Sequence, residues 1–254
     1  TADMSITRNN KIFITVLALF ALSLQNVKAT EECFEKTSRA IFKFNMALDD
    51  IIIEPIAKGY NKLPNPVKKG TSNFTSNISV LLSIPNNVLQ GQFKTAGVNT
   101  GRFIINTTVG ILGIFDVAKE MGFSEYEKED YGQTLAVWGV GPGCYIVLPV
   151  LGPSTLRDTA GSFINVMGGD PYYNVSAHGN NHYLDRSDYM LTKTVSAIDF
   201  RSKTIDSFDN LEKNSLDFYA SVKSLYLQDR QQKILNSKKN ISTQNDSDWE
   251  EIQN

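Results

Sequence analysis

His178 and His182 are the only histidines in the chain, and they lie four residues apart. On a helix this spacing would place both imidazoles on one face, as in a zinc site, but Gly179 stands where the helical zinc motif has a glutamate. The intervening glycine and asparagines disfavour a helix, and no obvious third ligand accompanies them. We therefore expect loop histidines and no metal, and a Ser-His-Asp hydrolase finds no well-placed base.

Two glycine-containing segments have residue types that carry chemistry in enzymes. Residues 139–144 read Gly-Val-Gly-Pro-Gly-Cys, but they lack the Gly-Lys-Ser/Thr ending of a phosphate loop, and Pro142 removes one N–H donor. Residues 152–156 lack the closing glycine of a nucleophile elbow. The adjacent carboxylates of Glu129 and Asp130 are typical of a solvated turn. The sequence thus predicts neither an enzyme nor a bound cofactor.

Composition excludes further classes of protein. The 254 residues include 25 basic and 27 acidic side chains, a net charge of −2, so there is no basic footprint for nucleic acid. Two cysteines, Cys33 and Cys144, cannot build a disulfide framework or a four-thiolate zinc site. A single disulfide between them is compatible with an oxidising compartment, but the sequence does not place the two Cα atoms, so the pairing stays open.

The two ends of the chain differ from its middle. Residues 1–29 have the three parts of a secretory signal peptide, with an apolar run over residues 12–24 and small side chains before a cut after Ala29. A retained membrane anchor is the alternative, although the run is short for a span. We expect a domain over residues 30–236 and a disordered acidic tail over residues 237–254.

Helical periodicity dominates the predicted domain. Apolar residues recur at helical spacing from residue 38 until Pro55, which is expected to end the first helix. A second helix is expected to begin at Pro66 and end before Pro85, and a third to cover about residues 86–107. Residues 145–148 have the pattern of a strand, and residues 188–236 that of one or two long amphipathic helices.

Small residues in the third predicted helix suggest a close contact. Gly97 and Gly101 have the small-xxx-small spacing that lets another backbone approach, in a membrane or in a water-soluble core.

Two stretches are almost free of charge. Residues 72–118 contain only three charged side chains and residues 131–156 contain none, yet neither has the ~18 unbroken apolar residues of a membrane span. One explanation is a core buried on every side. The other is a surface that faces lipid, with its irregular backbone turned inward against protein or a water-filled cavity. Composition alone leaves both explanations open.

An ordered series of short motifs extends over about residues 40–230, and it resembles the MlaA/VacJ family of outer-membrane phospholipid transport proteins. Among the motifs are Phe44-Asn45, Leu89-Gln90-Gly91, Arg102-Phe103, the run Glu129-Asp130-Tyr131-Gly132-Gln133-Thr134-Leu135, Trp138-Gly139-Val140-Gly141, Leu148-Pro149, Gly152-Pro153 and Arg157-Asp158, followed by Asp199, Arg201, Asp217, Tyr226 and Arg230.

The resemblance implies a mainly α fold, a helical ring-like membrane-associated domain with a short hairpin and a central amphipathic channel. It places the protein on the periplasmic side of a Gram-negative outer membrane, beside a trimeric outer-membrane porin. Phospholipid misplaced in the outer leaflet would pass to a soluble periplasmic lipid carrier without hydrolysis, which maintains lipid asymmetry. Two other readings are a secreted lipid-acting hydrolase and a surface or virulence factor.

The resemblance also suggests site residues. It assigns the segment 122–135 to the hairpin at the channel, so Tyr131 is the first candidate for lipid contact, and it assigns channel control to the region of Phe42, Phe44 and Asn45. A polar groove for the head group has as candidates the side chains Asn99, Asn106 and Thr107, which could equally cap and satisfy backbone groups.

The chain departs from the family at its N-terminal cysteine. Many members carry a lipid on that residue, but here Thr30-Glu31-Glu32 precedes Cys33 where small apolar residues are expected. We therefore expect that Cys33 is not lipidated.

Overall fold

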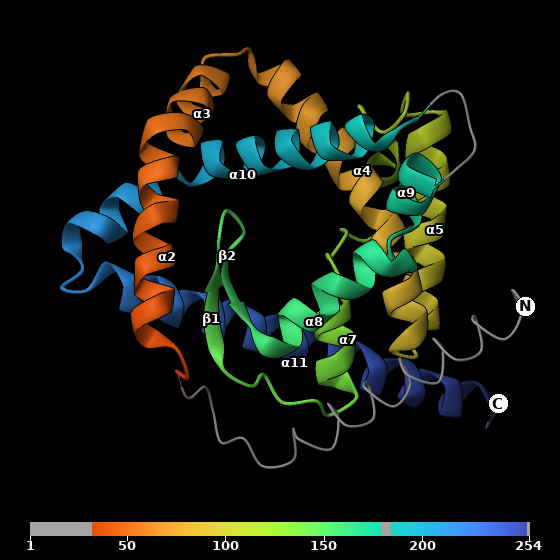
Figure 1. The fold of residues 1–254 in the computed structure, drawn as a ribbon. Helices are drawn as coiled ribbons and strands as arrows, with labels where there is room; N and C mark the ends of the chain where they lie inside the picture. The colour runs from red at the N-terminus through yellow and green to blue at the C-terminus, as the bar shows by residue number, and fades with distance from the viewer. Residues whose placement is uncertain (1–31, 179–183, 253–254) are drawn as a thin grey trace, which may run out of the picture.

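The computed structural model describes residues 32–178 and 184–252. Its elements follow one another around an open centre of the ribbon drawing (Figure 1): α2 and α3 lie on the left, α4, α5 and α9 on the right, and α8 at the bottom. The β1–β2 hairpin stands inside this circuit and α10 crosses it. This arrangement confirms the predicted helical, ring-like fold with one short hairpin. The predicted signal peptide, residues 1–29, lies outside the described residues.

The first helical segment does not end at Pro55. Helix α2 (Glu35–Leu48) continues through a π-helical turn, η1 (Asp49–Ile53), into α3 (Glu54–Asn61). Pro55 occupies the first turn of α3, a place where a helix tolerates proline. The prediction that Pro55 stops the helix was therefore wrong.

The next two helices are shifted along the sequence from their predicted positions. Helix α4 (Asn65–Leu89) has Pro66 in its first turn, as predicted, but it continues through Pro85. It ends only before Gly91, whose φ of +80° is left-handed and favours glycine, and α5 (Phe93–Thr108) follows. The packing of α4 against α5 outweighs the lost hydrogen bond at Pro85.

Residues 122–130 form no strand, and the hairpin lies further along the chain. After α6 (Val117–Glu120), the Asp130 side chain accepts a hydrogen bond from the Gln133 amide and begins α7 (Tyr131–Val137). Strands β1 (Tyr145–Leu148) and β2 (Gly152–Thr155) then pair antiparallel, with Tyr145 opposite Thr155. The strand predicted at residues 145–148 is confirmed, whereas the assignment of the hairpin to residues 122–135 was wrong.

The C-terminal half contains two long helices, where one or two were predicted. Short elements come first: α8 (Leu156–Ile164), η2 (Asn165–Gly169), α9 (Pro171–Tyr173) and η3 (Asn174–His178). The long helices α10 (Arg186–Asn214) and α11 (Phe218–Ile252) follow. Ser237, where the acidic tail was expected to begin, is fully buried within α11. His182 lies outside the described residues.

An aromatic core joins α2, β1 and α11. It consists of Phe42, Tyr145, Val147, Tyr219 and Val222, and the rings of Phe42 and Tyr219 meet edge to face at 5.4 Å between centroids. Beside it, a disulfide links Cys33 to Cys144 across 111 residues of sequence, so the pairing that the sequence left open is present in the structure.

Close backbone contact occurs at glycines other than Gly97 and Gly101. A Cβ atom at Gly97 would meet nothing within 4 Å, and one at Gly101 would meet only the ring of Phe123. In contrast, a Cβ on Gly161 would lie 2.4 Å from the amide nitrogen of Gly132, so glycine lets α7 and α8 pack backbone to backbone. In the part of the chain that the structure describes, no helix combines the length and the hydrophobicity that crossing a bilayer requires.

Candidate functional site

A cavity of about 420 Å³, which we call the central cavity, lies among the hairpin, α8 and the long C-terminal helices. Its wall is amphipathic. The apolar part consists of Leu82, Leu148, Leu151 and Pro153, and the charged part of Lys128, Asp130, Asp158, Lys193 and Arg230. Such a wall can hold the apolar and the polar parts of one amphiphile at the same time.

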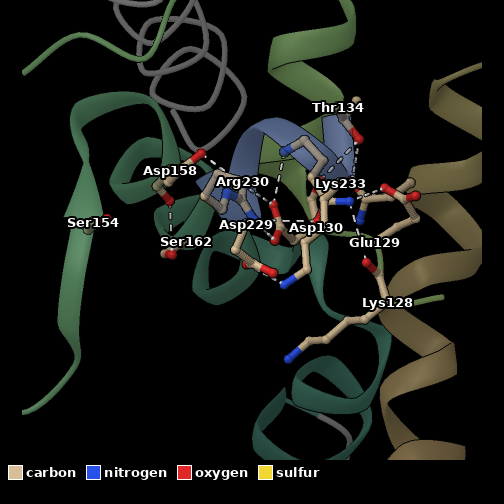
Figure 2. A network of polar contacts seen from close by, with 12 residues as sticks. Lys128, Glu129, Asp130, Thr134, Ser154, Asp158, Ser162, Asp229, Arg230 and Lys233 are labelled. Carbon is tan, nitrogen blue, oxygen red and sulfur yellow. Dashed lines mark hydrogen bonds and ion pairs between the residues drawn. The ribbon is translucent and has the colours of Figure 1, made fainter. Parts of the chain in front are cut away.

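Arg230 from α11 connects the charged part of the wall (Figure 2). Its Nη1 lies 2.6 Å from Oδ2 of Asp130 and its Nη2 lies 2.8 Å from Oδ1 of Asp158. The hydroxyl of Tyr226 donates to the other Asp158 oxygen at 2.7 Å. Arg157 is also paired with Asp158, at 3.0 Å. These ion pairs tie the start of α7 and the helix α8 to α11, and we call them the ion network.

The pKa values in the ion network follow from this pairing. Burial alone would raise the pKa of the Asp130 carboxyl, but the hydrogen bonds and charge of Arg230 hold that pKa below its usual range. Asp158 behaves in the same way, because the charges of Arg230 and Arg157 outweigh its burial. Both carboxylates are therefore ionised and neutralised by arginine.

The carboxyl of Glu129, one residue before Asp130, has uncharged partners. Gln90 and Gln133 donate to Oε2 at 3.0 and 2.7 Å, and Ser237 donates to Oε1 at 2.9 Å. Burial raises the pKa of Glu129 to about 7, because no cation among these partners offsets the loss of solvation.

From Glu129 a chain of buried amides leads to α5. Gln92 donates to Gln90 at 2.8 Å, Asn87 donates to Gln92 at 3.1 Å, and Asn99 donates to Asn87 at 2.8 Å. We call these four side chains the amide chain. The side-chain carbonyls of Asn87, Gln92 and Gln90 each accept a hydrogen bond from the next amide. The polar groups of the amide chain are therefore buried with little loss of free energy.

The predicted groove residues make internal hydrogen bonds. Asn99 belongs to the amide chain, and it lines a separate cavity of about 350 Å³ bordered by Glu125 and Glu127. Asn106 donates to Asp116 at 2.9 Å and accepts from the backbone amide of Ala118 at 2.9 Å. Their lipid contact stays a prediction.

Two other candidates are likewise engaged with protein. Thr107 accepts from Asn77 at 2.9 Å. Tyr131 is buried, and its hydroxyl donates to the Gly169 carbonyl at 2.7 Å. Neither side chain lines the central cavity, and their contact with lipid also stays a prediction.

Of the residues predicted to control a channel, Asn45 has the most direct connection to the cavity. Its Nδ2 donates to the Leu148 carbonyl at 2.9 Å, and its Oδ1 accepts from the Val150 amide at 2.8 Å, which fixes the hairpin turn. Phe42 belongs to the aromatic core and Phe44 is exposed. Their control of a channel stays a prediction.

Apolar side chains are exposed in the loop after α5. Between residues 109 and 115 the exposed side chains are Val109, Ile111, Leu112, Ile114 and Phe115. Backbone amides of this loop bond internally, for example Leu112 to Thr107, Gly113 to Asn106 and Phe115 to Gly110, at 2.7–3.0 Å. The explanation of the charge-poor stretch 72–118 by a core buried on every side is therefore wrong.

The hairpin turn repeats this combination. Val150 and Leu151 are exposed, and their amides bond to the Asn45 side chain and to the Pro149 carbonyl. Exposed apolar side chains over an internally bonded irregular backbone are what a nonpolar medium requires.

Three carboxylates, Asp49, Asp50 and Glu54, come close enough together to hold a metal ion. However, Arg201 pairs with Asp49 at 2.7 Å and with Glu54 at 3.2 Å. The guanidinium already supplies the positive charge that these carboxylates need, so this group fits an ion pair better than a metal centre.

Sequence reasoning missed Lys128 and Lys193 and named Asp158 and Arg230 only as family matches. The ion network unites residues that lie 72 and 100 positions apart, and no local pattern reports that proximity. The one sequence signal was the Arg157-Asp158 pair directly after a charge-free stretch.

Comparison with known proteins agrees with this architecture. The family model described as MlaA lipoprotein matches residues 30–233. A Rickettsia bellii protein is 38% identical over 79% of this chain and 76% of its own length. The Escherichia coli intermembrane phospholipid transport system lipoprotein MlaA is 32% identical over 84% of this chain and 82% of its own length.

A solved structure, from work on the structural basis for maintenance of bacterial outer membrane lipid asymmetry, superimposes with a TM-score of 0.69 and 30% identity. The match covers 80% of this chain and 99% of that one. Since the family model spans most of the chain and relatives above 30% identity align over most of their length, this chain belongs to the MlaA family.

Proposed function

We propose that this protein takes part in intermembrane phospholipid transport. It rests in one leaflet of the outer membrane from the periplasmic side, receives phospholipid misplaced in the outer leaflet, and passes it to a soluble periplasmic carrier. The observation that carries the proposal is the combination of lipid-compatible loops and an amphipathic cavity. The relatives named for intermembrane phospholipid transport support it.

The exposed loops supply the affinity for lipid. Each square ångström of apolar surface that leaves water contributes about 25 cal/mol, so the side chains of residues 109–115 and of the hairpin turn can hold the protein at a leaflet without a spanning helix. Because the amides that would otherwise face hydrocarbon bond internally, insertion leaves few polar groups unsatisfied.

The cavity supplies a path for the head group. A charged head group cannot cross hydrocarbon cheaply, so it needs polar partners while the acyl chains stay beside apolar ones. The ion network and the two cavity lysines, Lys128 and Lys193, offer polar partners to the head group. Leu148 and Leu151 of the hairpin offer apolar surface to the acyl chains.

The transfer itself requires no bond cleavage. We expect released lipid to keep its ester bonds, and mass spectrometry of lipid extracted by the purified protein tests this expectation. Appearance of lysophospholipid or fatty acid would favour a lipid-acting hydrolase instead.

The protein partners are proposed from the resemblance to the family, and the state of Cys33 is proposed from its disulfide. We expect a trimeric porin beside the ring and a soluble carrier on the periplasmic side, and co-purification from membranes tests both. Export by the predicted signal peptide leads to an oxidising compartment, where the Cys33 sulfur bonds to Cys144. A sulfur in a disulfide cannot form the thioether of a lipoprotein, which supports the expectation that Cys33 is not lipidated.

The membrane contact can be tested by flotation with phospholipid vesicles. Leu112→Asp places a charge in the exposed loop, and since Leu112 has a φ of +58°, which aspartate tolerates better than leucine, the backbone is not strained further. We expect this variant to lose most vesicle binding. The matched control is Leu216→Asp, at a fully exposed position between α10 and α11, which should float like the wild type.

The function can be tested in a Gram-negative strain that lacks its own family member. We expect the wild-type chain to lower the phospholipid exposed at the cell surface, and Leu112→Asp to fail. An unchanged surface in both cases would favour a surface or virulence factor that only binds partners.

A further inference from the structure

Lys128 borders two cavities. It lines the central cavity, and it also lines a second cavity of about 310 Å³ between residues 127–133 and α11. Lys128 is the only described residue found in the walls of both. Its side chain is therefore within reach of a molecule in either cavity.

The ammonium group of Lys128 has no acidic partner among the described residues, unlike the other cations of the two walls. Arg230 is neutralised by Asp130 and Asp158, Lys233 pairs with Asp229 at 2.7 Å, and Lys193 lies 3.5 Å from Asp170. In Figure 2 the Lys128 side chain extends away from the network around Arg230, and no dashed line reaches its nitrogen.

The surroundings of Lys128 favour an anion beside it. Lys128 remains exposed to solvent, but the protein atoms around its ammonium group displace part of its hydration and so lower its pKa, and the nearby charge of Lys193 lowers that pKa further. Lys233 and Arg230 act in the same direction, and Asp130 opposes them. An incoming negative charge would relieve this repulsion, and the nearby carboxylates of Asp130 and Asp158 are already occupied by arginine.

We propose that Lys128 binds the phosphate diester of a phospholipid head group as the lipid passes between the two cavities. The inference rests on the proposed function and assigns the residue that recognises the phosphate. Lys128 acts as a point charge, which suits a ligand that must be released again. In the wall of the central cavity, Leu148 and Leu151 supply the apolar surface that would contact the glycerol and the acyl chains of the lipid.

Binding of short-chain lipids to the purified full chain tests this assignment. The probes are dihexanoyl phosphatidylglycerol, neutral dihexanoylglycerol and inorganic phosphate, each titrated below micelle-forming concentrations by calorimetry. Lys128→Gln should weaken binding of the phosphatidylglycerol about fivefold to tenfold, since it removes a charge-assisted hydrogen bond, and Lys128→Arg should retain it. Binding of dihexanoylglycerol should not change.

Lys36→Gln is the matched control, because Lys36 is an exposed lysine on α2 that lines neither cavity. It should bind all probes like the wild type. Since Lys128 makes no ion pair, Lys128→Gln should keep the thermal midpoint of the wild type, which separates a binding effect from a folding effect.

Three results would overturn the inference. If the wild type and Lys128→Gln bind phosphatidylglycerol with equal affinity, Lys128 does not bind the lipid. If Lys128→Gln loses as much affinity for neutral dihexanoylglycerol as for phosphatidylglycerol, the side chain does not recognise the phosphate. Inorganic phosphate binding as tightly as the lipid reassigns the site to a free ion. Failure of the proposed function is distinguishable, because the wild type would then extract no phospholipid from vesicles at all.

Discussion

Glu129 and Asp130 are adjacent carboxylic acids with opposite environments. Asp130 meets Arg230, and its pKa lies below its usual range, whereas Glu129 meets amides and a hydroxyl, and burial raises its pKa to about 7. Two neighbouring residues thus belong to two kinds of interior. Ion pairs stabilise the one around Asp130, and hydrogen bonds between uncharged groups and the carboxyl stabilise the one around Glu129.

The two interiors face different parts of the molecule. The amide chain joins α4 and α5, which belong to the charge-poor stretch whose apolar side chains are exposed. The ion network joins α7, α8 and α11 around the central cavity. A neutral amide loses less free energy than an ion when it leaves water. Neutral hydrogen bonds thus prevail between α4 and α5, and a network of ion pairs lines the cavity, although one ion pair, Arg102 with Asp116, also lies in the charge-poor stretch.

The largest expected effect is on the ion network. Arg230→Met keeps the volume of the side chain but leaves the buried Asp158 and the half-buried Asp130 without this partner, so we expect a loss of about 3–5 kcal/mol in the free energy of unfolding. Urea denaturation of the wild type and the variant in the same detergent measures this free energy. The control is Lys233→Met, which removes an exposed ion pair with Asp229 and should change stability far less. Equal losses in the two variants would contradict the special role of the network.

The contribution of the Glu129 carboxyl to stability can be measured from the pH dependence of the free energy of unfolding. Its pKa is about 7 in the folded protein and about 4.5 in the unfolded chain, so the folded state holds this proton more tightly. The stabilising contribution is therefore complete below pH 4.5 and is lost as the pH rises through 7. Because a tenfold change in proton affinity is worth about 1.4 kcal/mol, we expect a loss of roughly 3 kcal/mol between pH 4.5 and pH 8.

Glu129→Gln should remove this part of the pH dependence when unfolding is measured at both pH values. Asp130 does not interfere, because a lowered pKa contributes stability that is lost only as the pH falls below about 4. A variant with the same slope as the wild type would show that Glu129 is ionised throughout.

Breaking the amide chain should cost less than breaking the ion network. Asn87→Leu removes the acceptor of Asn99 and the donor to Gln92, and we expect a loss of about 2 kcal/mol from the two unsatisfied groups. The double variant Asn87→Leu with Asn99→Leu should recover part of that loss in the same denaturation assay. No recovery would mean that packing, rather than hydrogen bonding, sets the cost.

The smallest expected effect is the difference between two tyrosine hydroxyl groups in part-buried hydrogen bonds. Tyr226 donates to the carboxylate of Asp158 and Tyr131 donates to the neutral carbonyl of Gly169, both at 2.7 Å. Because a hydrogen bond to a charged acceptor is the stronger one, Tyr226→Phe should lower the stability by about 1 kcal/mol more than Tyr131→Phe. If lipid extraction also falls in Tyr131→Phe at unchanged stability, the predicted lipid contact of Tyr131 gains support.

Much of the local structure could be predicted from neighbouring residues. Pro66 at a helix start and the strand at residues 145–148 follow from propensity and periodicity, which act within a few positions. Pro55 and Pro85 misled the prediction because their local cost was outweighed, at Pro55 by its place in a first turn and at Pro85 by packing against α5.

The candidate site was hardly predictable from the sequence. Asn99, Asn106 and Thr107 were sensible polar groups in an apolar stretch, but their partners Asn87, Asp116 and Asn77 were invisible until the helices were placed. Lys128 carried no signal at all, because its distinction is the lack of a partner in a place where every other cation has one.

The sequence by itself determined the helical class, the charge-poor middle and the absence of a long apolar span, since each depends on composition and short-range order. Only the tertiary structure decided that Cys33 bonds to Cys144, that Arg230 pairs with Asp130 and Asp158, and that Lys128 lines two cavities. The physical reason is that ion pairs and cavities depend on distances in space, and these are set by the path of the whole chain rather than by spacing along it.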